Sequence, residues 1–419
     1  MNGWLAMLAQ VGKHQGRNLW SVMRGRRPLT NAFTCMTLEL DDLELVRTWL
    51  ADRSRWSDDD IVRHFAAAFA AANGSKAAYA FASGREALSA AIEALALPEG
   101  SEVLMAGYTC IAVPNAIRFA GARPVYADIE TETFGLSVDA ARRAITQRTK
   151  ALLIQHSYGL VCRDYEALLD LAARERLFVI EDCAHALGST WRGVRVGNRG
   201  DVGIYSTERS KVLCTMQGGI AATSNPMLAE RLAERWQRCT RGQASAVEGL
   251  LRSAIVGYYR HKAPLREVLG DLVELAHATK EFQPLGPSTT PGELLGERPE
   301  GYGRRMAPAI AALGLNQLPK LERFAVLRRA SGQRWNELVS SLGSGIPRVL
   351  EGSVPAFLRY PVLVSEAQKR DTAWAEAAYG VLAGRWFETN LHPAPSRLEG
   401  CPNADLAVAR CINLPTLVA

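Results

Sequence analysis

VGIYSTERSK, residues 202–211, is the stretch that decides the fold class. A short apolar run typical of a buried strand leads directly into a hydroxyl at Ser206, and Lys211 follows five positions later. A lysine after a strand is ordinarily a solvated surface residue, because lysine is rarely buried without a reason. Whether Lys211 has such a reason depends on the strand that precedes it.

That upstream strand is LFVIEDCAH, residues 177–185, which ends in Glu181 and Asp182. Strand ends of a parallel sheet present functional side chains at one edge, so the two segments are expected to converge there. A buried lysine is deprotonated by desolvation and becomes a nucleophile toward an aldehyde such as that of pyridoxal phosphate. A carboxylate against the pyridine nitrogen keeps that nitrogen protonated. Asp182 could instead cap a helix, but Lys211 favours the cofactor role.

Strand-like and helix-like segments alternate through most of the chain. Strands are predicted at 77–82, 102–106, 124–128, 150–155, 177–181 and 202–206, and helices at 85–95, 140–146 and 165–175. This alternation predicts an α/β sheet covered by helices on both faces. From about Pro319 the pattern changes to a long helix at 318–342 and shorter segments, which predicts a smaller C-terminal α+β domain.

Seven sequence blocks, which overlap the two stretches above, occur in a fixed order along the chain. They are FASGREAL (81–88), AGYTCIAVPNAI (106–117), GARPVYADIETETFGL (121–136), RTKALLIQHSYG (148–159), VIEDCAHALGSTWRG (179–193), GDVGIYSTERSK with MQGGIAAT (200–223) and GYGRRMAPAIAALGLNQL (301–318). In order and spacing they resemble the DegT/StrS-type sugar aminotransferases, and seven ordered blocks are far more specific than one motif. The resemblance runs from about residue 60 to the C-terminus, apart from an interruption at roughly 240–295.

The resemblance implies an aspartate-aminotransferase-like fold (fold type I). A large domain with a mixed, mainly parallel sheet would span 31–318, including a helical insertion near 240–295, and a small α+β domain would span 319–419. Lys211 matches the lysine that bonds to pyridoxal 5'-phosphate and shuttles the proton, Asp182 the carboxylate under the pyridine nitrogen, and Ser206 a hydroxyl on the phosphate. A helix start after Gly84 independently suits an anion. The other cofactor contacts that the resemblance implies are Gly84, Arg85, Glu86, Cys110, Ala184 and His185.

Several positions depart from the family's pattern. His185 replaces a glutamine near the hydroxyl of the cofactor ring, where its charge is expected to vary with pH. Cys110 replaces an aromatic that stacks on the ring, so either Tyr108 moves in or the stacking face is thinner. Gly303 replaces an asparagine that reaches a phosphate across a dimer interface, and a neighbouring arginine would suit that phosphate. The candidate substrate contacts are therefore Tyr108, Tyr302, Arg304 and Arg305.

Composition agrees with a large enzyme that works in the cytoplasm. With 419 residues, 48% of them hydrophobic and 22% charged, the chain can bury a large core. The eight cysteines show no CxxC pair and no metal-ligand spacing, so neither disulfides nor a metal site is expected. Cys183 and His156 are interpreted as buried structural residues. The sequence shows no apolar run of spanning length and no nucleic-acid-binding module.

The first 30 residues form a basic amphipathic arm. Lys13, Arg17, Arg24, Arg26 and Arg27 stand there without one acidic residue, among apolar residues that include Trp4 and Trp20. This mixture fits a helix that lies on an anionic membrane surface, which predicts peripheral membrane contact. An arm that is frayed or packed in a dimer is an equal alternative. The apolar helical insertion near 240–295 is compatible with contact to a membrane, to the partner subunit or to the substrate.

Together these features predict a cytoplasmic, homodimeric, pyridoxal-phosphate-dependent aminotransferase. Its predicted reaction moves an amino group from glutamate to a nucleotide-linked keto-sugar, in the biosynthesis of a surface polysaccharide or a glycosylated metabolite. One alternative acceptor is another carbonyl, such as a lipid-linked keto-sugar that the basic arm would help to approach. A second alternative is a regulatory cofactor-binding protein with reduced turnover, for which Gly303 and Cys110 are the arguments. A dehydratase branch of the family replaces the lysine, so Lys211 argues against that activity.

Overall fold

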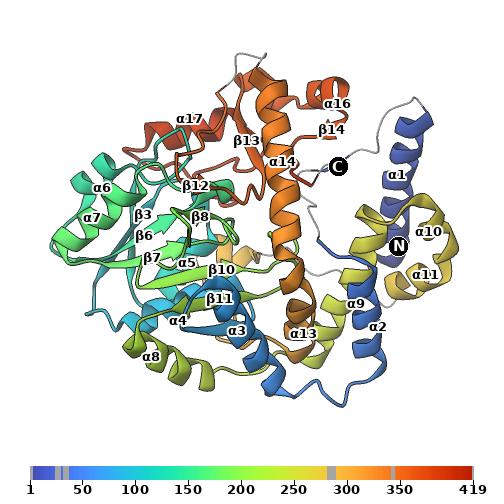
Figure 1. Cartoon of the computed structure of the whole chain (residues 1–419), viewed down its shortest axis with the longest axis horizontal. Coiled ribbons are helices and arrows are strands. Elements are labelled where there is room, and N and C mark those ends of the chain that lie inside the picture. The colour runs from blue at the N-terminus through green and yellow to red at the C-terminus, as the bar shows by residue number, and fades with distance from the viewer. Residues whose placement is uncertain (1–2, 24–29, 32–36, 281–288, 341–344, 418–419) are drawn as a thin grey trace.

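A seven-stranded sheet forms the centre of the computed structural model, which describes residues 3–23, 30–31, 37–280, 289–340 and 345–417 (Figure 1). The strands follow the order β2-β11-β10-β7-β6-β3-β5, and all neighbours are parallel except those of β11. Their bounds are β2 Ala77–Phe81, β3 Glu102–Ala106, β5 Arg123–Ala127, β6 Thr149–Gln155, β7 Phe178–Asp182, β10 Val202–Ser206 and β11 Gly219–Thr223. The predicted mixed, mainly parallel sheet is confirmed, and all six predicted strands are present.

Helices cover this sheet, and side chains in the sequence mark where several of them begin. Ser83 caps α4 (Gly84–Leu95), Ser137 caps α6 (Val138–Ala144), and Asn225 caps α8 (Pro226–Gln237), which has proline in its first turn. These caps satisfy N–H groups that have no partner inside the helix. α4 packs against β10 and β11, α5 (Ala112–Phe119) against α4 and β5, and α7 (Tyr165–Glu175) against β6 and β7.

The small domain has an apolar core of its own. That core gathers side chains of α14 (Leu321–Ser340), α16 (Ala373–Tyr379) and the antiparallel pair β13 (Tyr360–Leu363) and β16 (Cys411–Leu414). α15 (Glu366–Arg370) and α17 (Pro402–Arg410) complete its helices. The short strand β1 (Thr30–Asn31) pairs with β14 (Val381–Leu382), so this N-terminal stretch belongs to the small domain and not to the large one.

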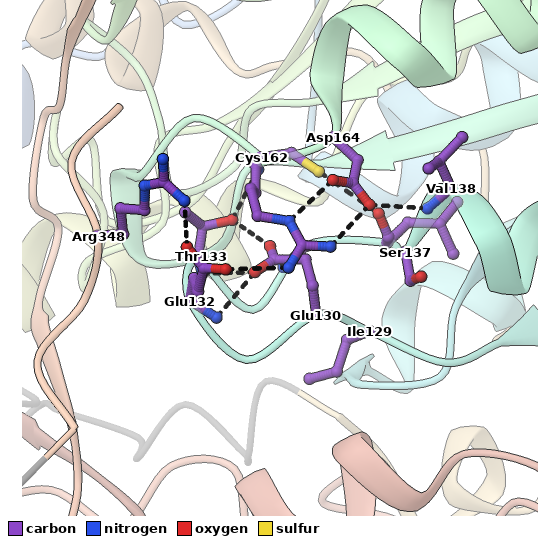
Figure 2. Close-up of polar contacts among 12 residues, drawn as sticks. Ile129, Glu130, Glu132, Thr133, Ser137, Val138, Cys162, Asp164 and Arg348 are labelled. Carbon is purple, nitrogen blue, oxygen red and sulfur yellow. Dashed lines mark hydrogen bonds and ion pairs between the residues drawn. The ribbon is translucent and has the colours of Figure 1, made fainter. Parts of the chain in front are cut away.

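Two small-domain strands pair with the large domain and fix the two parts together. β15 (Leu391–His392) runs parallel to β4 (Thr109–Cys110), and β12 (Ser353–Val354) is antiparallel to β8 (Thr190–Trp191), which also pairs with β9 (Val194–Arg195). A polar junction adds to this contact. Figure 2 shows Arg348 of the small domain on Glu132, in the loop after β5, and the distance from Arg348 Nη1 to Glu132 Oε2 is 2.7 Å. Arg163 holds the other oxygen of Glu132 at 3.0 Å.

The N-terminal arm is a helix that is docked on the insertion. α1 (Gly3–Met23) packs against α9 (Ala244–His261) and α11 (Leu272–Lys280), and α10 (Leu265–Gly270) lies beside them (Figure 1). Val11 and Gln15 are buried in this contact, and Gln15 Nε2 donates to the carbonyl oxygens of Tyr259 (3.1 Å) and Ala263 (3.2 Å). The described part of the arm is therefore not frayed.

The insertion itself rests on the helices that flank the large domain. α9 packs against α2 (Leu40–Ala51) and α13 (Pro308–Gln317), and α13 packs in turn on α3 (Asp59–Asn73). Both oxygens of Glu274 in α11 accept hydrogen bonds from the Arg47 guanidinium at 2.6 Å. In the described ranges no helix combines the length and the apolar character needed to cross a bilayer.

Candidate active site

Lys211 lies in a turn directly after β10, where its backbone N–H donates to the Glu208 carbonyl at 2.8 Å. Its side chain is partly buried. Burial lowers the pKa of the amine, and the charge of Arg359 lowers it further, whereas Glu208 and Asp182 act in the opposite direction. A lowered pKa favours the unprotonated amine, which is the nucleophilic form.

Asp182 ends the neighbouring strand β7 and is 6% exposed. The Ala184 N–H donates to its Oδ1 at 3.0 Å. Burial raises the pKa of this carboxyl, and the hydrogen bond from the Ala184 N–H and the charge of Lys211 counteract only part of that effect. A protonated pyridine nitrogen would supply the adjacent cation that favours the ionised carboxylate, so the environment of Asp182 fits pyridoxal phosphate.

Glu181, one residue earlier, has a structural environment. Its carboxylate accepts hydrogen bonds from the Tyr165 hydroxyl (2.6 Å) and from the backbone N–H groups of Gly197 (2.7 Å), Arg199 (2.9 Å) and Gly200 (2.6 Å). Burial by itself would raise the pKa of Glu181. The hydrogen bonds outweigh this effect and lower the pKa, and the bond with His156 contributes most. Glu181 therefore holds the loop before β10 through hydrogen bonds within the chain.

His156 is a satisfied interior histidine, as the sequence indicated. Its Nδ1 accepts the Cys162 N–H at 3.2 Å, and its Nε2 lies 3.2 Å from Glu181. One nitrogen, oxygen or sulfur atom of each of His156, Glu181 and Cys183 lies within 4.8 Å of the other two, and these side-chain types can bind a metal ion. Because hydrogen bonds already engage His156 and Glu181, we interpret this group as a structural one.

His185 is neutral and presents a hydrogen bond donor. Its Nδ1 accepts the Tyr158 N–H at 3.2 Å, so the single ring proton of the neutral form lies on Nε2. Burial holds the pKa of His185 well below its ordinary value, and the charges of Lys211 and Arg359 add to this. The prediction that His185 carries a pH-dependent charge is therefore wrong. A fixed Nε2 donor can replace the glutamine that the family pattern places near the ring oxygen.

The start of α4 lies against Ser206, the hydroxyl that the sequence predicts to bind a phosphate. A Cβ on Gly84 would lie 3.2 Å from Cβ and 3.4 Å from Oγ of Ser206, a contact so tight that Ser206 would have to give way by a few tenths of an ångström. The side chains of Arg85 and Glu86 are engaged elsewhere: Arg85 forms an ion pair with Glu293 of α12 (Pro291–Leu294), and Glu86 accepts the Gly303 N–H at 3.2 Å. The turn therefore offers backbone N–H groups and Ser206 to a phosphate.

Two residues of the small domain complete the site, and sequence reasoning missed both. The Lys211 Nζ lies 5.4 Å from the centre of the Trp386 ring, and the Arg359 Cζ lies 4.2 Å from that ring. His185 packs on another side of Trp386, with 4.9 Å between ring centres. Arg359 itself is buried. The aromatic pair in GRWFETN (384–390) was the one signal in the sequence, and it was assigned only to the small domain.

A cavity of about 550 Å³ adjoins this site, and Trp386 forms part of its wall. Most of its lining is polar or charged: Arg370, Asp371, Thr372, Ala383, Arg385, Trp386, Glu388 and His392. Cys110 is close by, because β4 and β15 place it opposite His392 in register. Burial raises the pKa of the Cys110 thiol, while the charge of Lys211 opposes this.

Tyr108 is fully buried, away from an accessible surface. Its hydroxyl lies 2.7 Å from that of Tyr158, and its ring lies 4.9 Å from Phe387. The hypothesis that Tyr108 replaces the missing stacking aromatic is therefore not supported by its position. Among the described residues Trp386 is the aromatic whose ring is recorded against Lys211.

Tyr302, Arg304 and Arg305 hold the loop 301–306 onto the body of their own chain. The Tyr302 hydroxyl donates to the Arg85 carbonyl at 2.9 Å. The Arg304 side chain contacts Glu86 and is 37% exposed, whereas Arg305 pairs with Asp59 at 2.9 Å. These contacts hold the three side chains to residues other than Lys211 and Asp182, and the idea that this loop reaches a partner subunit stays a prediction.

Comparison with known proteins identifies the family. The sequence model of the DegT/DnrJ/EryC1/StrS aminotransferase family matches residues 39–259 and 268–419, and the chain belongs to this family. It is 35% identical over 308 residues to GDP-perosamine synthase of Escherichia coli O157:H7, covering 72% of this chain and 70% of that enzyme. It is 34% identical over 224 residues to L-glutamine:2-deoxy-scyllo-inosose aminotransferase of Streptomyces kanamyceticus, covering 53% of this chain and 43% of that enzyme.

Solved structures show the same fold. DesV of S. venezuelae superposes with a TM-score of 0.68 at 24% identity, covering 90% of this chain and 89% of DesV. 3-Amino-5-hydroxybenzoic acid synthase superposes with a TM-score of 0.70 at 20% identity, covering 92% and 94%. The predicted family, fold and enzyme class are confirmed: the chain is a pyridoxal-phosphate-dependent aminotransferase that acts in sugar biosynthesis.

Proposed function

We propose that this aminotransferase takes its amino group from glutamate and transfers it to the keto group of a nucleotide-linked sugar, as a homodimer in the cytoplasm. The product would enter a surface polysaccharide or a glycosylated metabolite. The observation that carries the proposal is the position of Trp386, which lies against Lys211 and also lines the polar cavity. The relation to GDP-perosamine synthase, which is named for a nucleotide-linked amino sugar, supports the same acceptor class.

The residues at the strand ends have separate tasks. Bound pyridoxal phosphate supplies an aldehyde that bonds to amines and a ring that accepts electrons. Lys211 Nζ takes the proton from, and returns it to, the carbon next to the transferred nitrogen, which its lowered pKa favours. Asp182 holds the protonated ring nitrogen, and His185 Nε2 donates to the ring oxygen. Ser206 and the start of α4 hold the phosphate.

Arg359 is the proposed contact for the carboxylate of the amino donor. Its guanidinium is buried on Trp386 and lies close enough to Lys211 and His185 to lower the pKa of both. A planar guanidinium matches a carboxylate through two parallel hydrogen bonds. An amino acid bound there would have its amino group beside Lys211, as the first half of the reaction requires.

The cavity beyond Trp386 has the chemistry to bind a sugar phosphate. Arg370 and Arg385 offer positive charge to phosphate groups, and Asp371 and Glu388 can accept hydrogen bonds from sugar hydroxyls. The face of Trp386 can pack against the ring of the sugar. These features support a polar, anionic acceptor over an apolar keto compound.

A lipid-linked keto-sugar is a second candidate acceptor. It is favoured by one observation, the exposed apolar and basic surface of α1 at the end of the molecule that also holds the insertion (Figure 1). Both candidates use the same residues around Lys211.

The test combines a spectroscopic and a product assay. The purified protein, incubated with pyridoxal phosphate, is expected to turn yellow, and borohydride should fix a pyridoxyl group on Lys211 in wild type but not in Lys211→Ala. A panel of GDP-, UDP- and dTDP-linked 4-keto-sugars and polyprenyl-diphosphate-linked keto-sugars is then supplied with glutamate or glutamine, and mass spectrometry reads the amino sugar. Amination of polyprenyl-linked acceptors alone would select the second candidate. Cofactor loading without amination of any of these sugars would overturn both.

A further inference from the structure

α1 carries a second apolar face, on the other side of the helix from the face that is buried. The inner face, with Val11 and Gln15, is buried against the insertion. On the other side Leu5 (44%), Leu19 (46%), Trp20 (56%) and Met23 (76%) are exposed. At 100° per residue these four side chains lie on one side of the helix, together with the small residues Ala9, Gly12 and Gly16, and no charged residue interrupts them.

Positive charge borders this outer face. Lys13 and Arg17 lie along one edge of it, and Arg24, Arg26 and Arg27 follow the helix in the sequence, while residues 1–30 contain no acidic residue. Arg17 is paired with Glu376 of α16 at 2.8 Å, which fastens the helix to the small domain. The other basic residues have no acidic neighbour within the segment.

The adjoining helices add apolar groups at the same end of the molecule. Leu269, Leu272 and Val273 in α10 and α11 are exposed, and α11 packs directly against α1 (Figure 1). The acidic residues of these helices are engaged within the chain: Glu267 accepts the Tyr258 hydroxyl at 3.0 Å, Asp271 accepts the Tyr259 hydroxyl at 2.7 Å, and Glu274 binds Arg47. Residues 1–30 thus add basic groups and no acidic group to an end of the molecule where apolar side chains are exposed.

We propose that this surface, the outer face of α1 together with the exposed residues of α10 and α11, docks the enzyme on an anionic lipid membrane. An apolar stripe with tryptophan and flanking basic residues matches the boundary between acyl chains and anionic headgroups. A second copy is a poorer occupant, because an isologous contact would bring the basic residues of two arms together, and residues 1–30 contain no acidic residue that could pair with them. The inner face already fixes α1 to the body of the enzyme, so docking requires no rearrangement of the arm.

The experiment is co-sedimentation of the full-length holoenzyme with vesicles. Wild type should sediment with vesicles of equal parts phosphatidylcholine and phosphatidylglycerol, less with phosphatidylcholine alone, and less at high salt. Trp20→Glu combined with Met23→Glu should lower the partition coefficient by about tenfold or more, since it places charge within the apolar stripe. The control is Met227→Glu, which makes the same methionine-to-glutamate change at an exposed position in α8, outside the proposed surface. This variant should sediment as wild type does.

A second variant separates charge from apolar contact. Arg24, Arg26 and Arg27 changed together to glutamine should reduce binding to anionic vesicles and remove much of its salt dependence. Light scattering and thermal melting of every variant check the oligomeric state and the fold. The proposal would be overturned if wild type does not sediment with anionic vesicles. It would also be overturned if the Met227→Glu control loses as much vesicle binding as the double variant. Dissociation of a dimer by Trp20→Glu with Met23→Glu would assign the face to a second copy and overturn it as well.

Discussion

Asp182→Asn is expected to slow the first half-reaction without unfolding the site. The amide has the same shape, and its oxygen can still accept the Ala184 N–H. What is lost is the negative charge, in a place where Asp182 is 6% exposed and water compensates little. Leaving the charge of a buried pair without its partner costs about 3–5 kcal/mol. At about 1.4 kcal/mol per tenfold, the rate should fall roughly a hundred- to several-thousandfold.

The assay is a single turnover with glutamate, followed by the absorbance of the bound cofactor. The occupancy of the cofactor is measured separately, because Ser206, the start of α4 and Lys211 are untouched and binding should persist. Asp201→Asn is the matched control: Asp201 lies before the opposite end of β10, and its Oδ2 accepts the Val179 N–H at 2.7 Å. A rate for fully loaded Asp182→Asn within about tenfold of wild type would refute the assigned role.

Four further outcomes follow from the site. His185→Gln keeps a donor for the ring oxygen and should retain activity within about tenfold, whereas His185→Ala should lose more, read by single-turnover rates. Glu181→Gln should lower the free energy of unfolding by about 1.5–3 kcal/mol. In wild type the folded state lowers the pKa of Glu181, so the stability that this carboxylate contributes is present above its unfolded pKa and is lost as the pH falls through the folded value. Denaturant titrations at several pH values measure this loss. Burial lowers the pKa of His392 to about 4, so between pH 4 and about pH 6.5 the folded state binds fewer protons than the unfolded state. The free energy of unfolding of wild type should therefore fall as the pH is lowered through this range, and that of His392→Asn should fall less. Arg304→Ala should weaken cofactor affinity if the loop reaches a partner subunit. Arg305→Ala should mainly lower the melting temperature, because it removes one of the two arginines that pair with Asp59.

The sheet was predictable because its signal is local. Each predicted strand is an apolar run bounded by turn or helix-start residues, a signal that lies within the run and its immediate neighbours. β11 was not recognised as a strand, because Gly219–Thr223 contains glycine and two alanines, which carry weak β propensity. Most residues of β11 are small because the strand packs closely on its neighbours. A Cβ on Gly219, for example, would collide with the backbone of Ser83 at the start of α4.

The small-domain half of the site was not predictable from local patterns. Trp386 and Arg359 lie far along the chain from Lys211, and the pairing of β15 with β4 helps to join their domain to the large one. No periodicity in a single sequence specifies such a long-range contact. The same limit explains Tyr108, which was considered for the cofactor face by its position in a motif but is enclosed among Tyr158, Phe134 and Phe387.

The two adjacent carboxylates of β7 show how the fold separates roles that the sequence leaves joined. Neighbouring residues of a strand point to opposite faces of the sheet, so Glu181 and Asp182 cannot share one environment. On the side of Glu181, the Tyr165 hydroxyl, three backbone N–H groups and His156 lower the pKa of the carboxyl. On the side of Asp182, burial dominates and raises it. A carboxylate already supplied with donors stabilises a loop, whereas one that gains from an added cation is suited to hold a protonated ring. The surroundings of the two carboxylates thus favour Asp182 over Glu181 as the proposed partner of the cofactor, by an argument that does not depend on the resemblance.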